Sequence, residues 1–353
     1  MLTRHSKRIA LFLSAGTALS LALTGCSSDS GDGGTSGADG KPAADKAPKG
    51  VVTEAEAKKI VDNYVKVNNQ ANAKADAGLL STVEGDGLFE QSKAVYKTDK
   101  KSSAKRKAEA KKPFFYVDRD YLIPSRASGA TWFALHMRQA NAKGKVTSDA
   151  GAQGTLVFDR ENGGPWKAVW SGWTYKKDPK TPAFTKDAGG FVEPVTDTAK
   201  KTGVLAPDQM DDALVSMYDS NSKLGDKVGA SQTTKWMTKF PLDQNKMLNP
   251  GGSAEYKAGK NKNTKVYALK TKDGGTVTFF NAVVHEYMHA TDPNARITPS
   301  EQMAVFIGSK KDELTFVNNY LHQAEAFIPA KGTVDMVTSG YAMTNSEGPQ
   351  RGF

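Results

Sequence analysis

The segment from Thr276 to Thr291, TVTFFNAVVHEYMHAT, decides the fold because it permits two backbone conformations with different chemistry. It contains His285-Glu286-Tyr287-Met288-His289, which matches the H-E-x-x-H pattern of zinc peptidases. A helix would hold both histidines about 6 Å apart on one face, close enough for one zinc ion. A strand, at ~3.3 Å per residue, would separate them by about 13 Å and turn Glu286 to the opposite face.

The residues on the N-terminal side favour the strand. Asp273-Gly274-Gly275 is a turn typical of a hairpin, and residues 265–271 supply its first strand. The turn leads directly into the β-branched and aromatic run Thr276–Phe280, and Asn281 is the only residue that could cap a helix. We therefore predict that residues 276–291 are pleated.

A zinc-dependent metallopeptidase is the alternative. In it His285 and His289 would bind the metal, and Glu286 would be the general base toward metal-bound water. Such a site also needs a third protein ligand. Three downstream carboxylates are candidates, although none lies in an accompanying motif: Glu301, Glu313 and Glu325.

The rest of the second half contains helices followed by strands. Pro207 opens a helix with Met210, Leu214 and Met217 on one face, and irregular chain is expected through about Gly259. The remaining expected elements are a short helix capped at Thr298-Pro299-Ser300-Glu301 and ending near Ile307, and strands at Leu314–Ile328 and Thr333–Met343.

The first half has the same order. Thr53 and Glu56 form a capping box at the start of an amphipathic helix, and a short helix is expected at 75–83. The run Lys97–Lys112 carries eight basic residues and reads as a solvated loop or frayed helix, or as an electrostatic foot on an anionic surface. Four strands are expected after it: Phe114–Ile123, Thr131–Gln139, Gly154–Asp159 and Trp166–Tyr175.

Aromatic residues crowd the last of these strands. Alternation predicts Trp166 and Trp170 on one face and Trp173 and Tyr175 on the other. Most of these rings should pack in the core, and one pair would line a pocket between helices and sheet. A small apolar ligand is therefore one candidate partner.

These elements predict an α+β fold with two tandem domains after a leader and a tether. Each domain would pack helices into the hollow of a curved antiparallel sheet, an arrangement that resembles the cone of the nuclear transport factor 2-like fold. The expected segments are a signal peptide at 1–25, an acylated cysteine and flexible tether at 26–50, a domain at 51–176, a connector at 177–203 and a domain at 204–345.

The N-terminus carries the signal of an exported, lipid-anchored protein. Three basic residues precede an apolar stretch too short for a good membrane span. The stretch ends in Leu23-Thr24-Gly25-Cys26, which resembles the bacterial lipobox, and Cys26 is the only cysteine of the chain. The resemblance implies acylation of Cys26, with palmitate-like chains, after cleavage behind Gly25. Location at the extracytoplasmic face of the cell membrane follows.

The segment 27–50 lacks aromatic and branched aliphatic residues, so it cannot bury enough surface to offset its chain entropy. As a coil, this tether spans about 25–30 Å root-mean-square.

The mature chain is basic. Without the three basic residues of the leader, 45 of the 48 Lys and Arg residues face 38 acids, a net charge of +7. Such a charge favours anionic lipid headgroups or envelope polymers as partners, whereas nucleic acid is not expected outside the cytoplasm.

Several short motifs resemble a family of actinobacterial lipoproteins with a domain of unknown function. They are the lipobox, Tyr121-Leu122-Ile123-Pro124 with Trp132-Phe133, Gly163-Gly164-Pro165-Trp166-Lys167, residues 273–280 (DGGTVTFF) and residues 320–329. The resemblance implies a fold and a location, but no activity. The sequence therefore predicts a membrane-anchored, non-enzymatic binding or scaffolding module without a cofactor.

Overall fold

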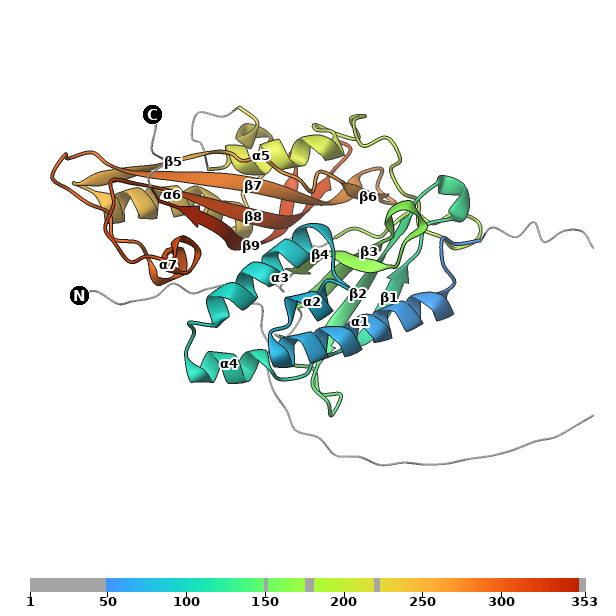
Figure 1. The fold of residues 1–353 in the computed structure, drawn as a ribbon. Coiled ribbons are helices and arrows are strands. Elements are labelled where there is room, and N and C mark those ends of the chain that lie inside the picture. The colour runs from blue at the N-terminus through green and yellow to red at the C-terminus, as the bar shows by residue number, and fades with distance from the viewer. Residues whose placement is uncertain (1–48, 149–151, 175–180, 219–222, 349–353) are drawn as a thin grey trace, which may run out of the picture.

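The computed structural model describes residues 49–148, 152–174, 181–218 and 223–348. The predicted leader, Cys26 and nearly all of the tether lie outside these residues. Within them the chain forms two antiparallel sheets, each packed with helices (Figure 1). The predicted α+β class is confirmed, whereas the domain boundaries stay predictions.

The first sheet is a four-stranded antiparallel meander in chain order. Its strands are β1 (Phe115–Leu122), β2 (Trp132–Ala140), β3 (Gln153–Asp159) and β4 (Lys167–Thr174). The helices before it are α1 (Glu54–Lys74), α2 (Ala77–Leu80), α3 (Asp86–Asp99) and α4 (Ala104–Ala110).

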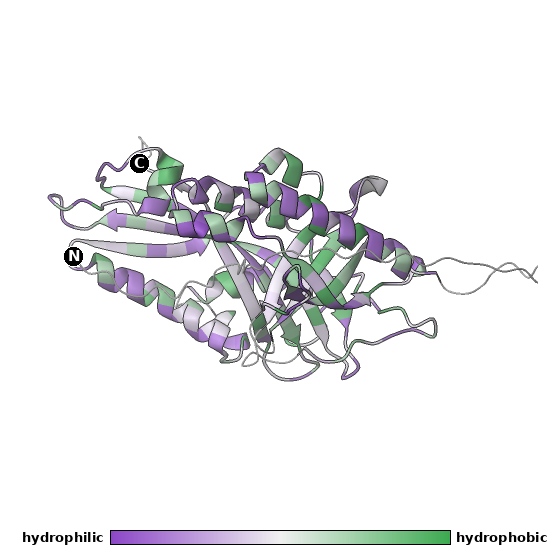
Figure 2. Cartoon of the chain, turned by 90° about the horizontal axis from the view of Figure 1, so that it is seen from below, coloured by the Kyte–Doolittle hydropathy of each residue, from purple (hydrophilic) through white to green (hydrophobic). Residues whose placement is uncertain are grey.

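Helix α1 begins at the predicted capping box. Thr53 Oγ1 accepts a hydrogen bond from the Glu56 backbone N–H, and the Glu56 carboxylate accepts one from the Thr53 N–H. The buried stripe of α1, which includes Val61 and Val65, packs with Phe133 on one face of the first sheet. In Figure 2 hydrophobic and hydrophilic residues alternate along the helices, as expected for helices that turn one face to a sheet and the other to water.

The second sheet has five strands in the order β5-β7-β8-β9, and β6 pairs with β7. These are β5 (Gly252–Ala258), β6 (Tyr267–Lys270), β7 (Thr276–Ala290), β8 (Thr315–Ile328) and β9 (Asp335–Glu347). The helices of this half are α5 (Met210–Ser216), α6 (Gln232–Leu248) and α7 (Glu301–Ile307). The prediction that the deciding segment is pleated is confirmed, since β7 pairs along one edge with β5 and β6 and along the other with β8.

Three elements were not expected from the sequence. Helix α3 was not predicted, and the chain before Gly259, expected to be irregular, forms α6 and β5. Helix α6 contains Pro241, a residue that removes an intrahelical hydrogen bond and masks the helical pattern. The cap of α7 is Ser300 rather than Thr298, because Ser300 accepts from the Met303 backbone N–H.

The two sheets share a hydrophobic core. One face of the first sheet is covered by α1 and α2, and its other face meets the second sheet. This shared core includes Trp132 and Trp170 from the first sheet and Val277, Phe279 and Phe327 from the second. The opposite face of the second sheet is covered by α5, α6 and α7.

Polar contacts also cross between the halves. The Trp170 indole N–H donates to the Phe280 carbonyl oxygen over 3.1 Å. Buried Gln323 accepts from the Ser171 backbone N–H (3.2 Å) and donates to the Val169 carbonyl oxygen (3.1 Å), as a neighbouring strand would. Backbone groups at the edge of β4 therefore form hydrogen bonds with residues of the second half instead of with water.

The described part of the predicted connector, from Thr181 onward, also pairs with the second half. Phe184 forms a bridge with Thr271 and Pro194 forms one with Leu269. Its Phe184 and Val192 side chains are buried in the shared core.

The predicted faces of the β4 tryptophans are wrong. Val157 pairs with Trp170 and Phe158 with Ala168, so Val169 is an extra residue that forms a β-bulge. The bulge shifts the alternation by one residue. Trp166 and Trp173 therefore pack on the α1 side and Trp170 packs in the shared core, while Tyr175 lies outside the described residues.

Among the described residues, no helix is both long enough and apolar enough to cross a bilayer.

We expect Trp170→Ala to lower the free energy of unfolding by about 3–5 kcal/mol, because it empties a fully buried site and removes the bond to Phe280. Trp173→Ala, three residues along the same strand at a partly exposed site, should cost less. Urea denaturation followed by circular dichroism measures both. Equal losses would contradict a core shared by the two sheets.

Candidate ligand pocket

Strand β7 separates the H-E-x-x-H residues onto two faces of the sheet. Val284, Glu286 and Met288 are buried on the face beneath α5 and α6, whereas His285 and His289 lie on the other face and are half-buried. The geometry that places two imidazoles around one metal ion is therefore not formed by this segment.

Each histidine of the motif has its own neighbours. His285 Nδ1 lies 3.2 Å from the Tyr287 hydroxyl, and burial lowers the pKa of His285. His289 Nε2 lies 2.9 Å from the Ser253 hydroxyl. They are two separate polar contacts along the strand.

The three carboxylates considered as a third ligand are not brought to these histidines. Glu301 is exposed in the first turn of α7, and Glu313 is paired with Lys311 at 3.5 Å. Glu325 is buried on β8, where it accepts from the Thr181 hydroxyl at 2.8 Å. In the described part of the chain, no three His, Cys, Asp or Glu side chains are grouped so as to hold a metal ion.

Glu286 is the centre of a buried polar cluster. Its side chain has no exposed surface, and four groups donate to it. Oε1 accepts from Tyr256 (2.6 Å) and Gln244 (3.1 Å), and Oε2 accepts from Asn318 (2.8 Å) and Tyr320 (3.1 Å). These four hydrogen bonds, from donors on α6, β5 and β8, replace the hydrogen bonds to water that the Glu286 carboxylate loses when it is buried.

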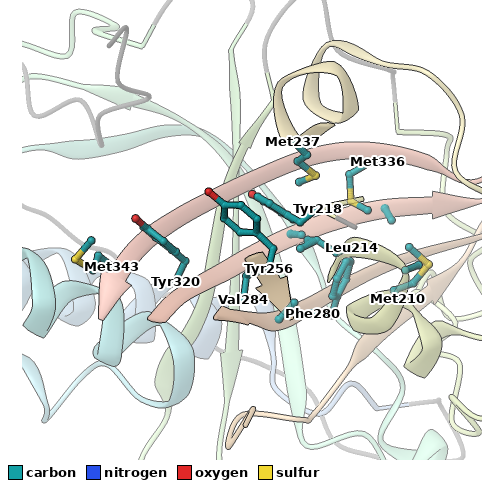
Figure 3. Packing of buried hydrophobic residues seen from close by; sticks show 14 of the residues in the cluster. Met210, Leu214, Tyr218, Met237, Tyr256, Phe280, Val284, Tyr320, Met336 and Met343 are labelled. Atoms are coloured by element: carbon teal, nitrogen blue, oxygen red, sulfur yellow. The ribbon is translucent and has the colours of Figure 1, made fainter. Parts of the chain in front are cut away.

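The same contacts hold the tyrosines as neutral donors. Burial raises the pKa of Tyr256 and of Tyr320, and the neighbouring Glu286 raises both further. Figure 3 shows Tyr256 and Tyr320 near Tyr218, which follows α5, among the buried residues of this core. The arrangement is a fixed platform of aromatic rings above one buried acid.

A second set of hydrogen-bonded side chains lies beside these tyrosines. His322 Nδ1 lies 2.9 Å from the Ser339 hydroxyl, and its Nε2 lies 3.3 Å from the Tyr218 hydroxyl. Burial lowers the pKa of His322 to about 3, so the imidazole is neutral at physiological pH. The Tyr218 and Tyr256 rings are 5.7 Å apart, and the Phe240 ring packs against both.

A pocket of about 530 Å³ opens above Tyr218 and Tyr256, a size that suits a small organic ligand. Its lining comes from α6, β5 and the end of α5: Met217, Tyr218, Thr238, Pro241, Leu242, Asn245, Ala254, Glu255, Tyr256 and Lys257. Leu242, at its edge, has 70% of its surface exposed.

The polar groups of the lining have intramolecular partners. Asn245 donates to and accepts from the backbone of Ala254, and Thr238 donates to carbonyl oxygens of its own helix. Glu255 and Lys257 form an ion pair of 3.0 Å at the edge. The surface left to a ligand is therefore largely apolar and aromatic.

The first half has a smaller pocket of about 300 Å³ that includes Tyr64 and Trp166. Here too a tyrosine contacts a buried acid, since Tyr64 (3.1 Å) and Asn68 (2.8 Å) donate to Glu84 Oε1. Burial raises the pKa of Glu84 to about 8, although hydrogen bonds from Ser92, Tyr64 and Asn68 lower it in part.

Sequence reasoning singled out Glu286 but missed the residues that surround it. Gln244 and Tyr256 lie in chain that was expected to be irregular. Asn318 and Tyr320 lie in a predicted strand, where Tyr320 begins the segment 320–329 that resembles the lipoprotein family but has no role assigned by that resemblance. The capping residue Ser231 was the available signal for α6, because its hydroxyl accepts from the Thr234 backbone N–H.

We expect Glu286→Leu to lower the free energy of unfolding by about 3–5 kcal/mol, because four donors, three of them on buried residues, lose their acceptor. Glu286→Gln should cost less than Glu286→Leu, since it keeps one acceptor oxygen. Glu255→Gln, at an exposed site on the neighbouring strand, should change the value by less than about 0.5 kcal/mol. Chemical denaturation compares them. A Glu286→Leu protein as stable as Glu255→Gln would contradict a structural role for this carboxylate.

The raised pKa of Glu84 predicts a pH dependence of stability. Between about pH 4.5 and 8 the folded protein holds a proton that the unfolded chain has released, so the free energy of unfolding falls as pH rises. We expect wild type to lose more stability between pH 5 and pH 8 than Glu84→Gln, measured by urea denaturation at both values. A larger loss in the variant would show that the sign is wrong.

The chain is similar to uncharacterized lipoproteins along nearly its whole length. Two are from Streptomyces coelicolor, both 26% identical over 98% of this chain and over 96% and 97% of their own lengths. A third, from Streptomyces avermitilis, is 26% identical over 94% of this chain and 92% of its own length. Residues 48–348 match the model of the family described as Domain of unknown function (DUF8094). Since that match covers most of the sequence, the chain belongs to this family.

Proposed function

We propose that the protein is a lipid-anchored binding module of the extracytoplasmic membrane surface that holds a small, neutral, apolar or aromatic ligand in the pocket above Tyr218 and Tyr256. The proposal rests on the chemistry of the residues that line this pocket. Its polar side chains are already paired, while the aromatic rings, Met217 and Leu242 offer apolar contact. A charged ligand would lose water in this pocket without gaining an unused partner.

The anchor is supported by the sequence and by the relatives. The lipobox-like run that ends in Cys26 would make this cysteine the acylation site, and the similar Streptomyces proteins are named as lipoproteins. Cleavage behind Gly25 and acylation of Cys26 would hold the body at the membrane surface, since two chains anchor much better than one.

The cone shape of each half is part of the proposal. Helices α1 and α2 cover one sheet and α5 and α6 the other, and both sheets are antiparallel. A pocket between helix and sheet in each half is consistent with this arrangement.

The zinc peptidase is less well supported, because its proposed general base is buried on the face opposite the two histidines. Glu286 already accepts four hydrogen bonds and has no exposed surface, so it has no access to a metal-bound water at His285 or His289.

The pocket can be tested with N-phenyl-1-naphthylamine, a neutral aromatic probe whose fluorescence rises in apolar surroundings. We expect saturable binding with one site per chain. Thr238→Phe should weaken it at least tenfold, because the ring would occupy the pocket and the Thr238 hydroxyl bonds only within its own helix.

Lys235→Phe is the matched control, since it adds the same ring one turn earlier on α6 at an exposed position outside the lining. Its binding should equal that of wild type. Equal affinity in all three proteins, or no saturable binding in wild type, would overturn the pocket assignment.

A further inference from the structure

Helix α4 and its flanks form a strongly basic end of the molecule. Six lysines are exposed there, and none has a carboxylate within 4 Å among the described residues: Lys97, Lys100, Lys101, Lys105, Lys107 and Lys111. We call these six residues the basic end. The carboxylates of the run 97–112 are already used, since Asp99 pairs with Arg106 and Glu109 with Lys112, each at 2.6 Å.

The core does not explain this helix. None of the residues of α4 is buried, and the helix carries only one acid among seven residues. Because α4 buries no residue, hydrophobic packing does not account for its sequence. We therefore look for the role of its lysines at the protein surface. The mutual repulsion of these lysines also costs stability, a cost that a nearby anionic partner would relieve.

Other groups extend the same surface. Strand β1 begins at Phe115, which is 39% exposed and pairs with Ala140 at the end of β2. The turn after Ala140 adds exposed Lys143 and Lys145. An exposed ring among lysines is suited to a lipid interface, where the ring enters the headgroup region and the amines meet phosphates.

The fold places the basic end within reach of the proposed anchor. The described chain enters at Lys49 and Gly50, where Gly50 bridges Ser125 after β1, and α1 then leads away from this point (Figure 1). Its 21 residues span about 30 Å, and α4 lies toward its far end. The 22 residues between Cys26 and Lys49, if fully extended, would cover about 75 Å, so an anchor at Cys26 does not prevent this end from facing the bilayer.

We propose that the basic end docks on the anionic lipid surface beneath the protein and orients the body on the membrane. The orientation rests on the proposed lipid anchor, but the affinity of the lysines for anionic lipid does not. The acyl chains would attach the protein, and a basic patch that meets anionic headgroups would add electrostatic attraction and fix which end of the body faces the bilayer. Each lysine near an anionic bilayer strengthens binding by roughly fivefold.

The test uses the chain from residue 26 onward, which keeps every described residue, with Cys26→Ser so that no acyl chain contributes. Binding to phosphatidylcholine vesicles with and without about one-third phosphatidylglycerol is measured by co-sedimentation. We expect binding only to the anionic vesicles and a steep loss at high salt. The combined variant Lys100→Glu, Lys101→Glu, Lys105→Glu and Lys107→Glu should bind at least about a hundredfold more weakly.

The control variant makes the same change of net charge in the second half, at exposed lysines: Lys246→Glu, Lys260→Glu, Lys262→Glu and Lys310→Glu. It should keep most of the binding, and circular dichroism checks that each variant is folded. Equal losses in the two variants would overturn the docking surface in favour of net charge alone. Binding to soluble poly-L-glutamate but not to the anionic vesicles would overturn it in favour of a polymer partner. Either result leaves the pocket assignment unaffected, because that assignment is measured with a neutral probe.

Discussion

The structure depends on the pleated conformation of β7. This strand pairs along both edges, and it contributes side chains to two cores. Val277 and Phe279 pack toward the first sheet, whereas Phe280, Ala282 and Val284 pack beneath α5 and α6. A helix of the same residues could not pair with β8 over 14 positions or fill both cores. The alternation of one strand therefore joins the two halves and builds the floor of the larger pocket.

The same alternation explains why a peptidase-like motif has no peptidase geometry. It places Glu286 in the core and leaves His285 and His289 at the opposite face. A buried carboxylate is tolerated only when its hydrogen bonds are replaced, and the four donors around Glu286 replace them. Because those donors include Tyr256, the electrostatic requirement of the acid also fixes an aromatic ring at the pocket. The hydrogen bonds around Glu286 thus contribute to the stability of the fold and also fix the shape of the candidate pocket.

The sequence predicted the elements whose patterns are local. The Thr53–Glu56 capping box, the turn at Gly274 and the long strands at 276–291 and 314–328 are readable because each depends on neighbouring residues. Helix α6 was not predictable in the same way, since Pro241 interrupts its pattern and its packing against β5 and β9 outweighs propensity. The bulge at Val169 reversed the expected faces of the β4 tryptophans. Partners of Glu286 from three separate elements carry no spacing rule, so only the fold brings them together.

The most direct test of this account is the periodicity of β7. In a Cys26→Ser background without other cysteines, single cysteines at positions 283 to 289 can be labelled with a maleimide. We predict faster labelling at the half-buried positions 283, 285, 287 and 289, and slower labelling at the buried positions 284, 286 and 288. A period of two confirms the strand on which the shared core, the Glu286 cluster and the pocket all depend. Labelling with a period near 3.6 residues, with 285 and 289 alike and 287 protected, would contradict it.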